Sequence, residues 1–322
     1  YNERLNTTTR GSRREFPVVA VIVADDDDTL TVYDGDDSNL LMWMVFKRNG
    51  SVGSNGNIIQ DQENHQPMPV VALDASIVVG GSFPVKINFA SDISYLWADG
   101  SGDWIYKAGI SKRNAGLGFA DLDNGNRIIN SIVNDVAMTV LPNAPIDYAT
   151  GLPIPTIAVA TDGGISVIKD DGTVVDLYRS VSGNEYVHQV AFNKDNSLFF
   201  SWGTTNGQER HLSYYETIPS SDDTEITDNY YPSANMGSTA FGTNGTGIVA
   251  NNGVDFAGSN DKTWLSRLMH TKESALNNTS SVAFITSTYN TGWMNGDIKL
   301  ATLSDTDATD VTGSELVTNG DF

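Results

Sequence analysis

Short apolar runs alternate with turns rich in Gly, Asp and Asn along most of this chain. Each repeated unit contains a strand resembling "VAL", "VAM" or "VAF", then a second strand such as "IAVAT" or "SLFFSW", then a glycine turn and a further strand. The pattern recurs in six segments, at 16–46, 68–97, 132–178, 186–218, 236–270 and 280–303. Repeats of about 35 to 50 residues that hold four short strands are typical of β-propellers. We therefore expect an all-β fold, a β-propeller of about six four-stranded blades (five to seven), with a β-sandwich or two smaller β-domains as alternatives.

The stretch "ATDGGISVIKDDGTVVDLY" (160–178) predicts a β-hairpin in detail. A two-residue loop at Asp171-Gly172 would pair polar with apolar side chains across the strands. A three-residue loop at 170–172 instead sorts the two faces, because it pairs Val167 with Val175, Ile165 with Leu177, and Ser166 with Asp176. This register favours a type I turn closed by a G1 bulge, with Gly172 at positive φ. The preceding strands of this unit are expected at 133–141 and 156–161.

Composition narrows the classes of partner. Forty acidic and 19 basic residues give a formal charge of −21, which argues against binding nucleic acid through its phosphates or binding an anionic membrane surface. The chain has no cysteine, so disulfides, thiol catalysis and cysteine zinc sites are excluded. No apolar run reaches the length of a transmembrane helix, and no convincing amphipathic helix is present, "WLSRLMHTKESAL" (264–276) being the nearest.

The two ends differ in composition from the repeated region. Residues 1–15 are polar, with a basic cluster at Arg10, Arg13 and Arg14, and are expected to be an arm or linker. The propeller-like domain is expected at 16–304, and residues 305–322 are expected to be a linker that leads into a further module. Both ends suggest a fragment of a longer polypeptide.

The segment "PNAPIDYATGLPIP" (142–155) interrupts the third unit. Its four prolines exclude a central strand, so we expect a rigid loop that projects from one rim. Loops at rims are common contact surfaces. The candidate partner-contact residues are therefore Pro142, Pro145, Tyr148, Pro153 and Pro155.

Several of these patches resemble large virion structural or tail-fibre proteins of marine tailed bacteriophages. The resemblance rests on "RREFPVVAVIVAD", "TVYDGDDSNLLMWMVF", "TGWMNGDIKLATLSDTD", "ELVTNGDF" and, most specifically, the patch at 134–175. It implies an extracellular virion location, oligomeric assembly and attachment to a host surface. It also implies that "ELVTNGDF" opens a jelly-roll module similar to carbohydrate-binding domains. The resemblance supplies no catalytic residues for this chain.

Aromatic residues offer one candidate binding surface. Trp97, Trp104 and Tyr106 flank the turn of "WADGSGDWIY", and Tyr230 and Tyr231 precede Pro232. Aromatic rings exposed beside Asp and Asn can bind sugars or proteins. The alternative for the same residues is packing between blades.

A calcium site is the candidate metal centre. Asp121, Asp123 and Asn124 in "DLDNGN" partly match an oxygen-rich Ca²⁺ loop, but the glycine comes one place early and the twelfth position is Ile132. A solvated loop is the alternative, and no other cofactor is expected. The acidic run at 25–28 is expected at a hairpin tip, and the four histidines lack metal-type spacing.

The resemblance, together with the lack of a catalytic motif, favours a non-enzymatic virion structural or tail-fibre component that acts in assembly, host-surface attachment or both. Expected partners are other virion proteins, copies of the same chain and a host-surface glycan, with no nucleic acid and no membrane insertion. The alternatives are a propeller enzyme that degrades polysaccharide, by hydrolysis or by a lyase reaction, and a secreted lectin-like protein. No HExxH, GxSxG or P-loop motif is present to support a particular enzyme class.

Overall fold

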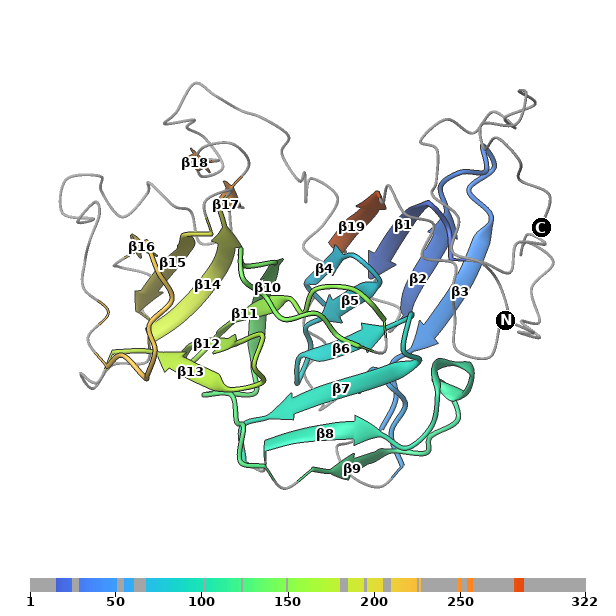
Figure 1. The fold of residues 1–322 in the computed structure, drawn as a ribbon, viewed down its shortest axis with the longest axis horizontal. Helices are drawn as coiled ribbons and strands as arrows, with labels where there is room; N and C mark the ends of the chain where they lie inside the picture. Colours follow the sequence, from blue (N-terminus) through green and yellow to red (C-terminus); the bar gives the residue numbers. More distant parts are fainter. Residues whose placement is uncertain are drawn as a thin grey trace.

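A computed structural model gives the fold as a set of antiparallel sheets (Figure 1). It describes residues 16–24, 29–50, 55–60, 68–100, 102–122, 124–148, 150–179, 185–193, 196–204, 210–224, 226, 248–250, 254–256 and 281–286. Within these ranges there is no α-helix, and a single 3₁₀ turn spans Ile110–Lys112. The all-β expectation is confirmed. The arm at 1–15, the acidic run at 25–28, the segment at 264–276 and the module start at 305–322 lie outside the described residues.

The described strands form five sheets, which we name A to E in the order of β1, β4, β10, β14 and β17. Sheet A has the order β19-β1-β2-β3, with β1 at Val19–Ala24, β2 at Thr29–Asp34, β3 at Met42–Lys47 and β19 at Ser281–Thr286. Sheet B runs from β4 to β9, at Val70–Leu73, Ser76–Val79, Val85–Asn88, Ile93–Ala98, Gly102–Tyr106 and Phe119–Asp121. Sheet C comprises β10 (Val133–Thr139), β11 (Thr156–Thr161), β12 (Gly164–Ile168) and β13 (Val174–Leu177). Sheet D comprises β14 (Glu185–Phe192), β15 (Leu198–Thr204) and β16 (Arg210–Tyr215), and sheet E comprises β17 (Ile248–Ala250) and β18 (Val254–Phe256).

The hairpin of sheet C has the register expected from the sequence. Val167 pairs with Val175, Ile165 with Leu177, and Ser166 with Asp176. Gly172 has φ +84°, and its N–H donates to the Lys169 carbonyl at 3.0 Å. The three-residue loop is therefore confirmed, and β10 and β11 occupy the places expected for the two preceding strands.

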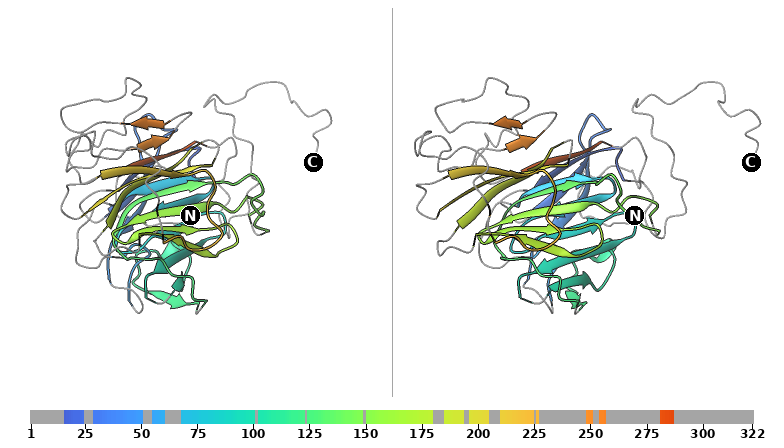
Figure 2. Two further views of the ribbon diagram at one scale, coloured as in Figure 1. Left: turned by 90° about the vertical axis from the view of Figure 1, so that its left-hand side faces the viewer. Right: turned by 60° about the vertical axis from the view of Figure 1, so that its left-hand side comes forward.

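Successive sheets pack against one another, and sheet C is packed on both faces. In β11 every residue is buried, and alternate side chains enter different cores. Ile157 and Val159 join the core shared with sheet B, whereas Ala158 and Ala160 join the core shared with sheet D. Sheet C accordingly lies between sheets B and D, as Figures 1 and 2 show. A chain of polar turns and apolar strands can bury so much surface only by stacking sheet on sheet in this way.

An edge strand of each sheet lies beside an edge strand of the next sheet. Strand β10 contacts both β4 and β14, β4 contacts β19, and β14 contacts β17. Sheet A also joins distant parts of the chain, because β19 pairs antiparallel with β1.

The uniform four-stranded unit expected from the sequence is only partly correct. Sheets A and C have four strands, but sheet B has six, and the described parts of sheets D and E have three and two. Sheet B is larger because the hairpin of β8 and β9 continues its outer edge. The described strands do not form a closed propeller.

Candidate functional site: the rim loop between β10 and β11

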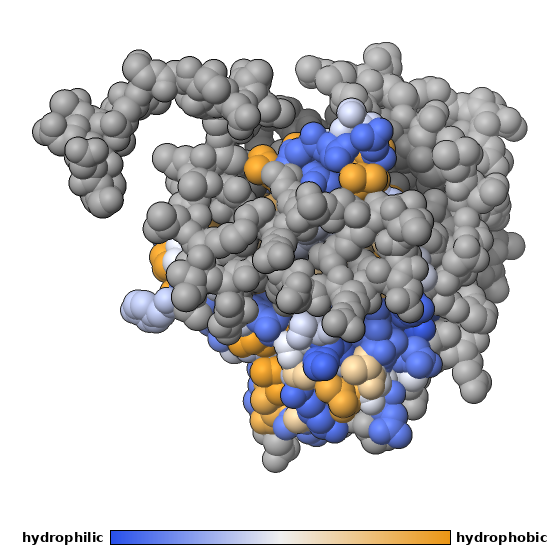
Figure 3. Space-filling model, turned by 90° about the vertical axis from the view of Figure 1, so that its right-hand side faces the viewer, coloured by the Kyte–Doolittle hydropathy of each residue, from blue (hydrophilic) through white to orange (hydrophobic). Residues whose placement is uncertain are grey.

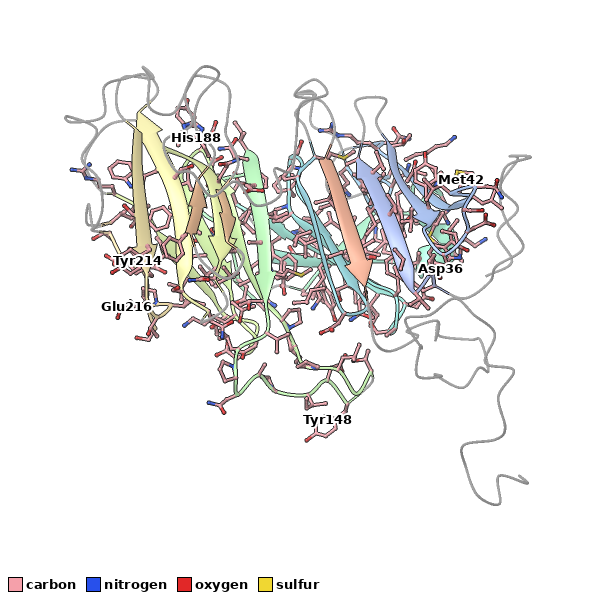
Figure 4. All side chains as sticks on the ribbon, turned by 90° about the horizontal axis from the view of Figure 1, so that it is seen from above. Asp36, Met42, Tyr148, His188, Tyr214 and Glu216 are labelled. Carbon is pink, nitrogen blue, oxygen red and sulfur yellow. The ribbon has the colours of Figure 1, made fainter. Side chains whose placement is uncertain are left out.

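The proline-containing segment leaves the body of the protein as a projecting loop. It connects the end of β10 to the start of β11, and we call residues 140–155 the rim loop. In Figure 4 the rim loop extends from one edge of the sheets with Tyr148 near its tip, while His188 lies at the opposite edge. The expectation of a projecting loop at 142–155 is confirmed.

Backbone hydrogen bonds close the rim loop into a narrow hairpin. Ile146 and Pro153 form an antiparallel bridge. The Ile154 N–H donates to the Pro145 carbonyl at 2.8 Å, and the Asp147 N–H donates to the Leu152 carbonyl at 2.9 Å. Because the prolines also fix φ, the loop has little conformational freedom to lose when it binds a partner.

Asp147 organises the tip of the rim loop. Its carbonyl accepts hydrogen bonds from the N–H groups of Gly151 at 2.7 Å and Thr150 at 3.2 Å. Its carboxylate accepts a 3.0 Å hydrogen bond from the Thr150 hydroxyl. Gly151 has φ +70°, a backbone conformation that favours glycine at this turn.

The negative charge of the Asp147 carboxylate also influences the pKa values of two residues on sheet B. Burial lowers the pKa of Lys86 on β6, and the negative charge of Asp147 opposes that shift. Burial raises the pKa of Tyr95 on β7, and the charges of Asp103 and Asp147 raise it further. Lys86 and Tyr95 are register partners, so the charge of Asp147 acts on one cross-strand pair of sheet B.

Two large hydrophobic side chains of the rim loop are exposed. Tyr148 is fully exposed at 103 % and Ile146 is 52 % exposed. Of the other candidate contact residues, Pro142 and Pro145 are exposed, Pro153 is half-buried and Pro155 is buried. Further large exposed hydrophobic side chains, such as Leu117 and Leu122, are scattered singly over other parts of the described surface. Among the coloured residues in Figure 3, hydrophobic and hydrophilic ones are intermixed.

The aromatic candidates around the β7–β8 turn serve packing. Trp97 is 6 % exposed and joins the core between sheets B and C, and Tyr106 is 4 % exposed. The Tyr106 hydroxyl donates to the Lys112 carbonyl at 2.9 Å, and its ring meets Phe119 edge-on. Trp104 is half-buried against the core of sheets A and B. The expectation of an exposed sugar platform is therefore wrong for Trp97 and Tyr106, because both rings are buried in hydrophobic cores. Tyr230 and Tyr231 lie outside the described residues.

The calcium candidates lie at the outer end of sheet B. Asp121 ends β9 and Asn124 follows it, and both are exposed, whereas Asp123 lies outside the described residues. The Asn124 side chain accepts a 3.2 Å hydrogen bond from the Asn126 N–H. Within the described ranges, no three His, Asp or Glu side chains are grouped as metal ligands. The calcium site stays a prediction.

One polar cluster had no function assigned from the sequence. The Ser166 hydroxyl donates to the Asp176 carboxylate at 2.6 Å and accepts a 2.8 Å hydrogen bond from the Ile129 N–H. Burial raises the pKa of Asp176 to about 6; the Ser166 hydrogen bond opposes this shift and the charge of Asp222 adds to it. The hairpin register predicted from the sequence pairs Ser166 with Asp176. This polar pair between apolar pairs is the sequence feature that could have indicated the cluster.

The cluster continues into the segment after β16. The Asp222 carboxylate accepts a 3.0 Å hydrogen bond from the Asp176 N–H, and the Asp223 N–H donates to the Asp176 carbonyl at 2.9 Å. The Tyr215 hydroxyl donates to the Asp223 carboxylate at 3.0 Å; burial, and then this carboxylate, raise the pKa of Tyr215. These contacts attach residues 222–223 to the edge of β13.

Comparisons with known proteins assign no family. No family model matches the chain, and no curated protein matches it. Among solved structures, apo AztD from Citrobacter koseri is similar at 13 % identity and a TM-score of 0.26, over 61 % of this chain and 67 % of that one. The extracellular domain of a putative hybrid two-component system from B. thetaiotaomicron is similar at 12 % identity and a TM-score of 0.24, over 76 % of this chain and 37 % of that one. Likenesses this weak carry no argument about fold or function. In the described part of the chain, no helix has the length and apolar character needed to span a membrane.

Proposed function

We propose that sheets A to E are the blades of a propeller-like ring. The edge strands β19, β4, β10, β14 and β17 lie next to one another in this order, which supports this arrangement. They would be the innermost strands of the blades, which surround a common axis in a propeller. The pairing of β19 with β1 supports it too, because it joins the two ends of the repeated region in one sheet. Such a ring would leave the loops at its two rims free for contacts.

We further propose that the module is non-enzymatic and works in assembly or surface attachment through the rim loop. The observation that carries this proposal is the full exposure of Tyr148 on a loop that Asp147 holds rigid. Exposed aromatic side chains on rigid loops supply much contact area for little loss of conformational entropy. The sequence resemblance to tail-fibre proteins supports placing this work on a virion, outside the cell, with virion proteins, copies of the chain or a host glycan as partners.

A combined binding experiment tests the proposal. The full chain and its Tyr148→Ala variant are applied to a glycan array, and their self-association is followed by sedimentation velocity. We expect wild type to bind a glycan or to associate, and the variant to lose at least fivefold in affinity. Leu117→Ala is the matched control, because Leu117 is 42 % exposed on another loop.

Two results would contradict the proposal. One is binding or association that Tyr148→Ala leaves unchanged. The other is release of cleaved saccharide from the array, which would favour the polysaccharide-degrading alternative. An activity of that kind would require paired carboxylates in a cleft.

A further inference from the structure

We infer that residues 219–224 form a pH-sensitive strap, which covers the outer edge of β13 in weakly acid solution and loosens toward neutral pH. The strap leaves sheet D after β16 and reaches the edge of sheet C, where Leu177 and Asp223 form a parallel bridge. The inference follows from the hydrogen bonds that hold the strap and from the two carboxylates that these bonds bring together. It does not depend on the rim loop.

The strap occupies the hydrogen-bonding positions of an edge strand. The Tyr178 N–H donates to the Asp223 carbonyl at 2.9 Å, and the Asp223 N–H donates to the Asp176 carbonyl at 2.9 Å. The Asp176 N–H donates to the Asp222 carboxylate at 3.0 Å. Without these partners β13 would present free backbone groups at the edge of sheet C, and such an edge can pair with another chain. The strap therefore controls access to this edge.

Apolar anchors on both sides limit the movement to a short segment. Ile218 packs against the core shared by sheets C and D, and Ile226 is buried in the same core. Between these anchors Ser220 and Asp222 are exposed. The Ser220 carbonyl accepts a 3.3 Å hydrogen bond from the Lys169 ammonium group. An exposed segment that is held by polar contacts can open locally while the sheets around it stay folded.

The closed strap places two carboxylates near each other. Burial raises the pKa of Asp176 to about 6; the Ser166 hydrogen bond opposes this shift and the charge of Asp222 adds to it. At pH 5 the Asp176 carboxyl is therefore mostly neutral, and the strap closes over it without repulsion. At pH 7.5 the carboxylate is ionised, and opening of the strap lets it gain water and move away from Asp222. Ionisation of Asp176 consequently favours the open strap.

Further titratable or charged groups lie on the elements that contact Asp176 or the strap. They are Arg127, Lys169, Asp170, Asp171, Tyr178, Arg179, Tyr215, Glu216 and Asp223. Hydrogen bonds from Thr173 lower the pKa of Asp171, and burial raises the pKa of Tyr215, so neither group titrates between pH 5 and 7.5. We therefore assign the change in charge over this range to Asp176.

Hydrogen exchange of the full chain tests the inference. The protection of the Asp176, Tyr178 and Asp223 amides is measured at pH 5 and 7.5 and corrected for the intrinsic effect of pH on exchange. A shift from the ordinary pKa of about 3.9 to about 6 gives at most about a tenfold loss of protection over this range, and partial exposure of Asp176 reduces the loss. We expect a loss of about three- to fivefold. The three amides should also exchange at least tenfold faster than the β11 amides and without dependence on low concentrations of urea, as local opening requires.

Three variants separate the charge of Asp176 from other causes. Asp176→Asn removes the titrating charge, so its amide protection at pH 7.5 should exceed that of wild type about three- to fivefold and should no longer change with pH. Asp222→Asn keeps an oxygen acceptor but removes the second charge, and it should give a smaller pH response than wild type. Asp171→Asn is the matched control on the same hairpin and should respond to pH like wild type.

The opposite results would overturn the inference. One is a pH response of Asp176→Asn equal to that of wild type, and another is wild-type protection that does not change between pH 5 and 7.5. Exchange of the strap amides at the rate and urea dependence of the β11 amides would show that the strap does not open on its own. Circular dichroism shows whether each variant folds. If Asp176→Asn does not fold, an undiminished pH response of Asp222→Asn would contradict the inference instead.

Discussion

The Ser166 hydroxyl donates a 2.6 Å hydrogen bond to the Asp176 carboxylate across a strand pair whose other facing residues are apolar. The carboxyl is partly buried and near Asp222, and its pKa is raised to about 6. An acid whose folded pKa lies above its unfolded value of about 3.9 binds its proton more tightly in the folded state. Its contribution to stability is therefore complete below about pH 4 and is lost as pH rises through about 6.

Asp176→Asn tests this linkage. The amide oxygen can still accept from Ser166, but no charge has to be buried. Because Asp176 is partly open to water, we expect the variant to gain only on the order of 1 kcal/mol in unfolding free energy at pH 7.5. The gain should shrink toward zero at pH 4, as measured by urea unfolding across this range.

Asp171→Asn is the control for the pH dependence of Asp176→Asn, because it also replaces an aspartate of the same hairpin. The Asp171 carboxylate accepts hydrogen bonds from the Thr173 hydroxyl and N–H, which lower its pKa. Its effect on stability should be constant between pH 5 and 7.5, and should change only in more acidic solution. A gain for Asp176→Asn that does not depend on pH would show that the raised pKa of Asp176 is not its cause.

Two glycines of the same sheet should respond differently to alanine. Gly172 has φ +84° with open space around an added Cβ, whereas at Gly164, with φ +136°, an added Cβ would lie 2.6 Å from the Leu177 carbonyl oxygen. Gly172→Ala should cost about 1 kcal/mol through backbone strain alone. Gly164→Ala should cost at least about 2 kcal/mol, because strain and a clash with backbone add.

Thermal and urea unfolding of both variants measure the difference. Gly172→Asn is the control, since asparagine tolerates left-handed backbone and should cost less than alanine. Equal costs for the two alanine variants would contradict the close approach of Gly164 to Leu177.

How far the sequence predicts this fold depends on whether the contacts are local. The register of β12 and β13 and the positive φ of Gly172 follow from side-chain alternation and turn chemistry within one hairpin, so they could be predicted. The burial of Trp97 could not, because the sheet that covers it comes from residues 133–168. For the same reason the rim loop could be located from the sequence, but the influence of Asp147 on the pKa of Lys86 could not.

Side chains on β10 connect sheet C to sheet D. The Asn134 amide donates to the Val187 carbonyl at 2.9 Å and to the Asp162 carboxylate at 2.8 Å. The Asp135 carboxylate accepts from the Val190 N–H at 3.1 Å. Asn134→Ala should destabilise the protein by about 1–3 kcal/mol, because partly buried acceptors lose their donor.

Asn39→Ala is the control for this prediction. The Asn39 amide donates at 3.0 Å to Asp37 within an exposed turn, so its removal should change stability by less than about 0.5 kcal/mol. Equal stability of Asn134→Ala and wild type in urea unfolding would show that the Asn134 hydrogen bonds do not stabilise the packing of sheet C on sheet D.

Because β19 pairs with β1, a C-terminal truncation should affect folding only if it removes β19. Strand β1 has the sequence VAVIVA and lies between β2 and β19, with six residue pairs to β19 from Val19–Thr286 to Ala24–Ser281. A chain that ends at residue 279 lacks β19, and it leaves this uncharged, β-branched strand as an open edge, which favours aggregation. We expect that chain to lose cooperative unfolding and to aggregate, whereas a chain that ends at residue 304 should unfold like the full sequence. Size-exclusion chromatography and thermal unfolding compare the two, and a monomeric chain 1–279 with an unchanged midpoint would show that β19 is not needed to complete sheet A.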